Sequence, residues 1–264
     1  MNAQELYRLL EIPEEVTQRL MKENVTAPEK ITALYLNRST SGEGLKQLTE
    51  YVGEDPDGLS MLHALLHMAL QSWQKYEQSG ISQTVFADTM KFVTRTLREH
   101  RQQRGTYEFH KAWWFWRELC LEEFRLGCLE YEMVPADEGK VISIHIPSDA
   151  DLRPEAVDAS FAAFRAFAEA YYPEWTDAKW ICDSWMMCPA LRQLLPETSN
   201  IVRFQKRFDT VKVSDDTQGV LEWVFPPHQE ISEELPEHTS LQRKMKAYLL
   251  GGGLIGWTKA ELKP

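Results

Sequence analysis

Side chains able to do chemistry gather in the second half of the chain, where predicted strands end or begin. Asp183, Ser184 and Trp185 close an apolar strand, and Asn200 and Arg203 open the next predicted strand. In open α/β sheets, ligands bind beyond the ends of the strands. We therefore expect a binding site at these positions.

His145 lies near the end of another predicted strand, VISIHIP, and histidine suits a general base because the unperturbed pKa of an imidazole lies near neutrality. The alternative is that His145 only donates to a backbone carbonyl. The Arg203 guanidinium offers a bidentate fork for a carboxylate or a phosphate. Asn200 could help it or could be a turn residue. Trp185 is either a pocket wall or part of the core.

Other reactive side chains lack the pattern of a site. The four cysteines form no C-x-x-C pair, and Cys182 stands among apolar residues, which make a thiol unreactive. His63 and His67 are four residues apart on a predicted helix, yet no H-E-x-x-H pattern surrounds them. We expect no metal site and no disulfide framework, and reduced thiols favour a cytoplasmic protein.

The composition limits the possible partners. The chain has 264 residues, 43% of them hydrophobic, and a formal net charge of -11. Such a negative charge opposes binding to nucleic acid or to an anionic membrane. No apolar run approaches the ~20 residues that a membrane-spanning helix needs. We expect neither nucleic acid nor membrane as a partner.

Hydrophobic spacing divides the chain near residue 120. Up to that point the apolar residues recur with a helical period, which predicts a helical N-terminal domain over residues 1–120. Residues 121–264 then change to strands and helices in the order β-β-α-β-α-β-β. The predicted elements are strands at 125–133 and 141–147, a helix at 153–172, a strand at 179–185, a helix at 190–195, strands at 201–213 and 219–225, a helix at 239–250 and a loose end.

Several stretches resemble a bacterial family of two-domain N-acyltransferases, with a helical N-terminal domain and a GNAT-like C-terminal domain. They are FRLGCLEYEM (124–133), HIP (145–147), CDSWMMCPALRQLLPETSNIVRFQKRF (182–208) and TSLQRKMKAYLLGG (239–252). The resemblance implies an α+β fold in which the helical domain packs on a mixed β-sheet with flanking helices. It also implies that strands 141–147 and 179–185 are parallel neighbours, with the acyl-CoA thioester in the gap between them.

The turn after strand 141–147 departs from the GNAT pattern. Such enzymes ordinarily bind the CoA pyrophosphate with a basic, glycine-rich turn at a helix N-terminus. Here the turn reads PSDADLRPEA, without glycine, with Asp149 and Asp151, and with Arg153 as its only cation. Two carboxylates repel phosphate, so we expect CoA to bind weakly in the standard pose.

Two functions of different classes follow. The first is transfer of an acyl group from a thioester, either acyl-CoA or a carrier-bound acyl group, to the amine of a small molecule. For this reaction His145 would be the base, Ser184 would protonate the leaving thiolate or position the substrate, and Trp185, Asn200 and Arg203 would bind substrate or donor. The alternative is a noncatalytic GNAT-like module that binds a ligand or a protein after losing the cofactor turn.

Overall fold

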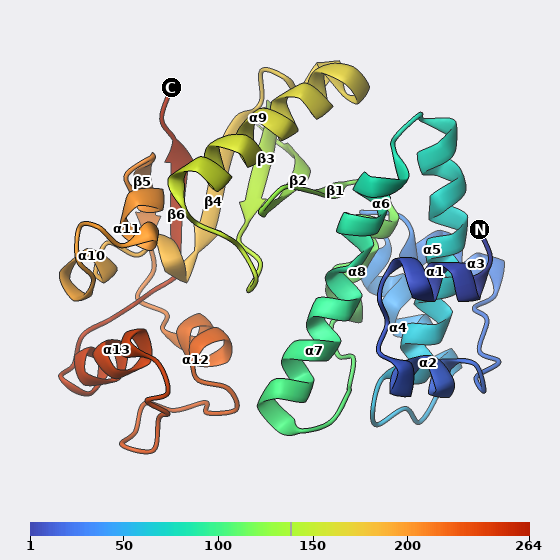
Figure 1. The fold of residues 1–264 in the computed structure, drawn as a ribbon, viewed down its shortest axis with the longest axis horizontal. Helices are drawn as coiled ribbons and strands as arrows, with labels where there is room; N and C mark the ends of the chain where they lie inside the picture. Colours follow the sequence, from blue (N-terminus) through green and yellow to red (C-terminus); the bar gives the residue numbers. More distant parts are fainter. Residues whose placement is uncertain (138) are drawn as a thin grey trace. The chain divides into compact units, whose positions relative to one another are not determined.

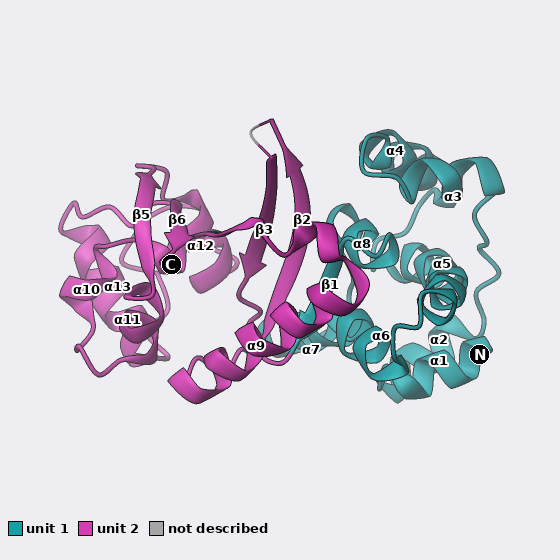
Figure 2. Ribbon diagram, turned by 90° about the horizontal axis from the view of Figure 1, so that it is seen from above, with its two compact units in different colours: residues 1–126 teal, residues 127–264 magenta. Residues whose placement is uncertain are grey.

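The chain folds into two compact units. A computed structural model describes residues 1–137 and 139–264. Unit 1 is Met1–Leu126 and unit 2 is Gly127–Pro264 (Figure 2). Among the described residues, no helix is at once long enough and apolar enough to cross a bilayer.

Unit 1 is a helical layer, as its apolar period predicts. The long helix α5 forms its centre, and Leu62, Leu65 and Ala69 on α5 are completely buried. The elements of this unit are α1 (Ala3–Leu9), α2 (Glu14–Leu20), α3 (Glu29–Tyr35), α4 (Ser41–Val52), α5 (Leu59–Gln78), α6 (Gln83–Met90), α7 (Phe92–Arg104), α8 (Ala112–Leu119) and β1 (Glu123–Leu126).

Unit 2 is built on a mixed sheet, so the predicted α+β class is confirmed (Figure 1). Its strands follow the spatial order β2-β3-β4-β6-β5. Its elements are β2 (Leu129–Ala136), β3 (Gly139–His145), α9 (Pro154–Tyr171), η1 (Pro173–Trp175), β4 (Lys179–Ser184), η2 (Trp185–Met187), α10 (Leu191–Leu194), α11 (Asn200–Gln205), β5 (Phe208–Val213), α12 (Gln218–Val224), α13 (Ser240–Leu250) and β6 (Thr258–Leu262).

The central prediction about the sheet is confirmed: β3 and β4 are parallel neighbours. Their register pairs Val141 with Lys179, Ile142 with Trp180 and Ser143 with Ile181. The other contacts of these two strands are antiparallel, β3 with β2 and β4 with β6. The β3–β4 pair is thus the parallel centre of an otherwise antiparallel sheet.

Helix α9 connects β3 to β4 and covers one face of the sheet (Figure 1). Its apolar stripe is buried, namely Val157, Phe161, Phe164, Phe167 and Ala168. The Phe164 ring stacks on Tyr131 of β2 at 4.3 Å between centroids and meets Trp180 of β4 edge-on at 5.3 Å. The Tyr131 hydroxyl and the buried Ser160 hydroxyl hydrogen-bond at 2.8 Å. An aromatic layer therefore fixes α9 across β2 and β4.

The predictions for three later segments are wrong. Residues 200–205 form helix α11 where we expect the start of a strand, and only Phe208–Val213 is extended. Residues 218–224 form helix α12, because Val220 and Leu221 fill a second apolar core with residues of α10 and α13. The expected loose end instead holds β6, which pairs with both β4 and β5.

Replacing Phe164 with alanine tests the aromatic layer. Phe164 is 1% exposed, so truncation removes its buried ring and leaves a cavity. We expect the free energy of unfolding to fall by about 3–5 kcal/mol. Urea denaturation followed by circular dichroism measures the change. Glu169→Ala, at an exposed position of the same helix, is the matched control and should change stability by less than about 0.5 kcal/mol.

Candidate active site at the ends of β3 and β4

The parallel ladder between β3 and β4 is short and ends before either strand does. Among the described residues, its last pair is Ser143 with Ile181. Beyond that pair, β3 continues with β2 as far as His145, which lies opposite Glu130. Strand β4 continues with β6 as far as Ser184, which lies opposite Thr258. The facing edges of β3 and β4 therefore stop bonding to each other at their carboxyl ends, where ligands bind in sheets of this type.

His145 is the last residue of β3 and contacts a carboxylate on β2. Its Nε2 lies 3.2 Å from Oε2 of Glu132. The Glu132 side chain is 8% exposed and that of His145 is 21% exposed, so the carboxylate is buried while the imidazole reaches the surface. With the proton on Nε2, the ring donates to Glu132 and Nδ1 carries the lone pair. A buried carboxylate behind an imidazole orients the ring and stabilises its protonated form, as in a base with an orienting partner.

Asp183 is a further acidic residue at this site. By the regular pleat, Ser143, His145, Ile181 and Asp183 point to the sheet face opposite α9. Lys259 on β6 lies opposite Asp183 in the register. Desolvation raises the pKa of the Asp183 carboxyl, and the charges of Lys259, Lys212 and His145 oppose that rise in part. Asp183 and His145 therefore interact electrostatically at the ends of neighbouring parallel strands.

The glutamates of β2 are buried, although strand carboxylates of this kind are usually solvated. Counted as whole residues, Glu130 and Glu132 are each 6% exposed. Their alternation with Tyr131 assigns both to one strand face, but the sequence alone gave no way to pair Glu132 with His145. That pairing depends on the register of β2 against β3, which joins residues 13 positions apart.

Ser184 and Trp185 have different surroundings from His145. Ser184 shares the pleat direction of Trp180 and Cys182, so its side chain leaves the sheet on the α9 side, opposite to His145. Its hydroxyl accepts a hydrogen bond from the Met186 N–H at 3.1 Å and caps η2. Trp185 is partly buried against the second core. The side chains of His145 and Ser184 therefore lie on opposite faces of the sheet.

Asn200 and Arg203 lie on α11 rather than at the start of a strand. Asn200 is half-buried in the first turn, whereas Arg203 is exposed. The helix is fixed through Gln205, which is completely buried. The Gln205 amide donates to the carbonyls of Met186 at 2.7 Å and Cys188 at 3.0 Å, and its oxygen accepts from Arg192. Through Gln205, α11 holds the segment that follows β4.

The turn between β3 and α9 is closed by an internal ion pair. Asp151 accepts from the backbone N–H of Arg153 at 3.0 Å and from its Nε at 2.9 Å. This partner lowers the pKa of the Asp151 carboxyl to about 2. The one cation of the turn is therefore neutralised by the turn itself, which strengthens the expectation of weak phosphate binding in the standard pose.

A second cation reaches the first turn of α9 from outside the turn. Nη2 of Arg207 lies 3.3 Å from the Pro154 carbonyl oxygen, and Nη1 of the same guanidinium pairs with Asp158. The guanidinium also lies over the Phe161 ring at 5.9 Å. Arg207 follows α11, so a guanidinium from a different part of the chain reaches the start of α9, where it pairs with Asp158.

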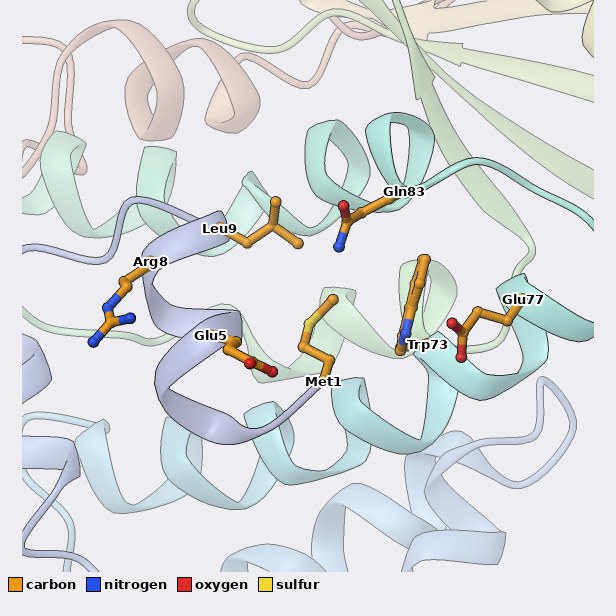
Figure 3. A pocket seen from close by; sticks show the side chains of 7 residues that line it. All are labelled: Met1, Glu5, Arg8, Leu9, Trp73, Glu77 and Gln83. Carbon is orange, nitrogen blue, oxygen red and sulfur yellow. The ribbon is translucent and has the colours of Figure 1, made fainter.

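Two other features do not contribute to this site. Cys182 is completely buried, and burial raises the pKa of its thiol well above the usual range, so it is no nucleophile. A hollow of about 630 Å³ in unit 1 is lined by Trp73, Glu5 and Glu77 among others (Figure 3). None of the five predicted site residues lines it.

The sequence matches two family models in succession. The model of the N-acyltransferase N-terminal domain covers residues 1–121, and that of the GNAT-like C-terminal domain covers residues 123–260, which is more than half of the chain. The chain belongs to this two-domain acyltransferase family. The suspected family is therefore confirmed, and the diverging β3–β4 pair lies in its GNAT-like domain.

Solved structures with the same fold cover 99% of this chain. An acyltransferase in complex with decanoyl-CoA and teicoplanin superposes with a TM-score of 0.78 at 23% identity over 88% of its own chain. An acyltransferase in complex with decanoyl-CoA gives 0.72 at 21% identity over 99% of its chain. An acyltransferase in complex with CoA and 10C-teicoplanin gives 0.79 at 22% identity over 87% of its chain. No curated protein sequence matches the chain.

Asp183→Asn tests whether the site carries a destabilising carboxylate. Folding raises the pKa of this carboxyl above its unfolded value of about 3.9. The carboxyl's contribution to the free energy of unfolding is therefore fully present below pH 3.9 and is lost as the pH rises through the pKa of the folded state. The asparagine variant avoids the loss. Because Asp183 is exposed, we expect a small gain in melting temperature over the parent at pH 7.5 and a gain that shrinks as the pH falls toward 4.

Differential scanning fluorimetry across this pH range measures the effect. Asp177→Asn, at an exposed aspartate of the same unit, is the control and should show no such pH-dependent gain. A constant difference between Asp183→Asn and the parent at every pH would contradict the assignment.

Proposed function

We propose that the protein transfers an acyl group from a thioester donor, acyl-CoA, to the amine of a small molecule. The observation that carries the proposal is the parallel β3–β4 ladder that ends at Ser143 and Ile181, with the His145–Glu132 pair beside the opening. Membership in the two-domain acyltransferase family supports the same reaction class.

The chemistry assigned to the chain is proton transfer at His145. An amine attacks a thioester only as the neutral base, so its ammonium proton has to be removed. With Nε2–H directed at Glu132, Nδ1 of His145 is the atom that accepts this proton. Glu132 then lies beside the imidazolium and stabilises its charge. Ser184 remains a candidate for protonating the leaving thiolate, acting from the opposite side of β4.

The donor would lie between the diverging strands. Beyond Ser143 and Ile181 the edges of β3 and β4 no longer bond to each other. The pantetheine arm of CoA carries two amides, and an extended chain with amides can bond to open strand edges as an added strand does. We propose that this contact, with Arg207 at the first turn of α9, holds the donor in place of the usual phosphate turn.

The choice of acceptor rests on the two carboxylates beside His145 and on the similar structures. Glu132 and Asp183 lie on the same sheet face as His145 and favour a cationic amine. One similar acyltransferase was solved with decanoyl-CoA and teicoplanin, a glycopeptide. We propose an amine-bearing small molecule for this chain, with glycopeptides as the first class to test.

Activity assays on variants of His145 and Glu132 test the proposal. Release of free CoA from octanoyl-CoA or decanoyl-CoA is followed with a thiol reagent against a panel of amines that includes teicoplanin. We expect amine-dependent release, a loss of about 10²-fold or more in kcat for His145→Ala, and a smaller loss for Glu132→Gln, because a removed general base costs 10²–10⁴-fold.

Ser184→Ala separates a chemical role from a capping role. A residue that only caps η2 should lose stability and leave kcat within about tenfold of the parent, whereas a proton donor should lose more. Circular dichroism and melting curves confirm that each variant is folded. Amine-dependent release that survives unchanged in His145→Ala would remove His145 from the mechanism.

A noncatalytic binding module remains the second candidate, favoured by the Asp151–Arg153 pair in the phosphate turn. Such a module would be stabilised by its ligand through mass action without turnover. Melting temperatures measured with acetyl-CoA, decanoyl-CoA and free CoA, combined with the release assay, distinguish the two. Stabilisation by a ligand without release in the presence of any amine would favour the module.

Asp151→Asn tests the phosphate turn directly. The substitution removes the carboxylate that holds Arg153, so the guanidinium can meet a phosphate at the start of α9. We expect weak CoA binding by the parent and several-fold tighter binding by Asp151→Asn in isothermal titration calorimetry at low salt. Adding Arg153→Ala should reverse the gain, and Asp177→Asn is the control for the change in net charge. Tight binding by the parent that none of these changes alters would contradict the role of the turn.

A further inference from the structure

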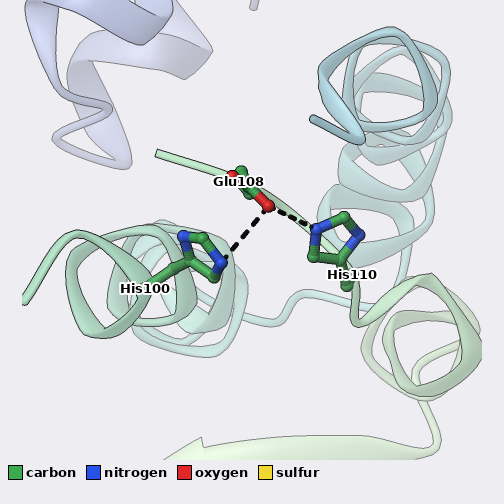
Figure 4. A group of neighbouring side chains, drawn as sticks. All are labelled: His100, Glu108 and His110. Atoms are coloured by element: carbon green, nitrogen blue, oxygen red, sulfur yellow. Dashed lines mark hydrogen bonds and ion pairs between the residues drawn. The ribbon is translucent and has the colours of Figure 1, made fainter. Parts of the chain in front are cut away.

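Two imidazoles and one carboxylate converge at the end of α7 in unit 1, and none of the three belongs to the proposed catalytic residues. Nε2 of His110 lies 2.8 Å and Nε2 of His100 lies 3.3 Å from Oε2 of Glu108 (Figure 4). One potential ligand atom from each of the three residues lies within 4.8 Å of the others. These are the donor types that divalent transition-metal ions prefer.

The backbone holds the three residues in place. Helix α7 ends at Arg104, and Gly105 takes φ +80, a left-handed conformation that reverses the chain. The returning segment is fixed by Phe109, whose ring is buried and whose N–H donates to the Asp57 carbonyl at 2.9 Å. Because Phe109 points into the core, its two neighbours Glu108 and His110 are presented together beside His100.

Outer hydrogen bonds orient two of the three groups toward a common point. Nδ1 of His100 lies 2.9 Å from the Thr106 carbonyl oxygen, so Nδ1 carries the proton and Nε2 directs a lone pair toward Glu108. The Thr106 hydroxyl donates to Oε1 of Glu108 at 2.9 Å, which leaves Oε2 toward the imidazoles. Metal-binding histidines have the same arrangement, with the second ring nitrogen donating to a carbonyl or carboxylate.

The side chains around this point also suit a cation. Glu108 supplies an acidic group, and its Oε2 faces both imidazoles. The nearby Arg101 guanidinium is bonded to the Gly105 carbonyl and lies over the Tyr107 ring.

We propose that His100, Glu108 and His110 bind a divalent transition-metal ion of the zinc class. In a tetrahedral site with bonds of about 2.0–2.1 Å, ligand atoms are about 3.3 Å apart. The two measured separations, 2.8 and 3.3 Å, need only small adjustments. The His110 side chain is 53% exposed, so the fourth position opens to solvent. The ion would join the end of α7 to the segment that enters α8.

Zinc titration of the full chain tests the proposal. Protein freed of metal with a chelator is titrated with ZnCl2 in a calorimeter, and its melting temperature is measured with and without zinc. We expect one ion per chain and a raised melting temperature. Both Glu108→Gln and His110→Ala should weaken the affinity at least about tenfold. Cobalt(II) gives a second readout, because its visible absorption changes when a nitrogen and oxygen site replaces water.

The matched controls are histidines that lie elsewhere. His67→Ala disrupts the His63–His67 ring pair on α5, and His238→Ala removes an exposed imidazole of unit 2. Neither should change zinc binding. Zinc binding lost in either control, or binding and cobalt spectra unchanged in Glu108→Gln and His110→Ala, would overturn the proposal. Circular dichroism verifies that the variants fold, and Glu108→Gln is nearly isosteric at a partly exposed position, so its folding is least at risk.

Discussion

The structure of unit 2 depends on a competition among strands for hydrogen-bonding partners. β3 bonds to β2 along its whole length and β4 bonds to β6 at its carboxyl end, so within the described part of the chain the two parallel strands share only the pairs at 141–143 and 179–181. Beyond these pairs each of the two strands continues with its other neighbour, β3 with β2 and β4 with β6. The early end of the β3–β4 ladder thus goes together with the pairing of the outer strands.

The two faces of this sheet have separate roles. One face carries Tyr131 and Trp180 and is covered by the aromatic side of α9, which supplies most of the packing. The other carries His145 and Glu132, together with the carboxylate of Asp183. Because side chains alternate along a strand, the packing residues and the residues proposed for proton transfer occupy alternate positions of the same strands. These acidic groups, of which Glu132 is buried and Asp183 is exposed, are thereby kept apart from the layer on which folding depends.

The sequence predicts what local periodicity determines. Alternating isoleucines define β3, and the spacing of Phe161 and Phe164 defines α9, so the parallel pair and its crossover helix could be expected. Helix α11 could not, because its short apolar run suits a strand equally well and its geometry is set by Gln205, which bonds to carbonyls distant in sequence. The partner of His145 was missed for a related reason, since strand register is decided by the whole β2–β3 hairpin. His100 and Glu108 come together because the chain reverses at Gly105. The sequence spacings typical of metal ligands do not predict such a reversal.

The position of β6 in the sheet has a consequence for how the chain folds. β6 lies between β4 and β5, yet all of α10, α11, β5, α12 and α13 precede it in the sequence after β4. During synthesis, β4 emerges long before the strand that will cover its edge, and β5 has no neighbour in the sheet until β6 arrives. Pairings between such distant segments slow folding and leave strand edges exposed to other chains. Unit 2 should therefore complete its sheet late, after β6 has joined β4 to β5.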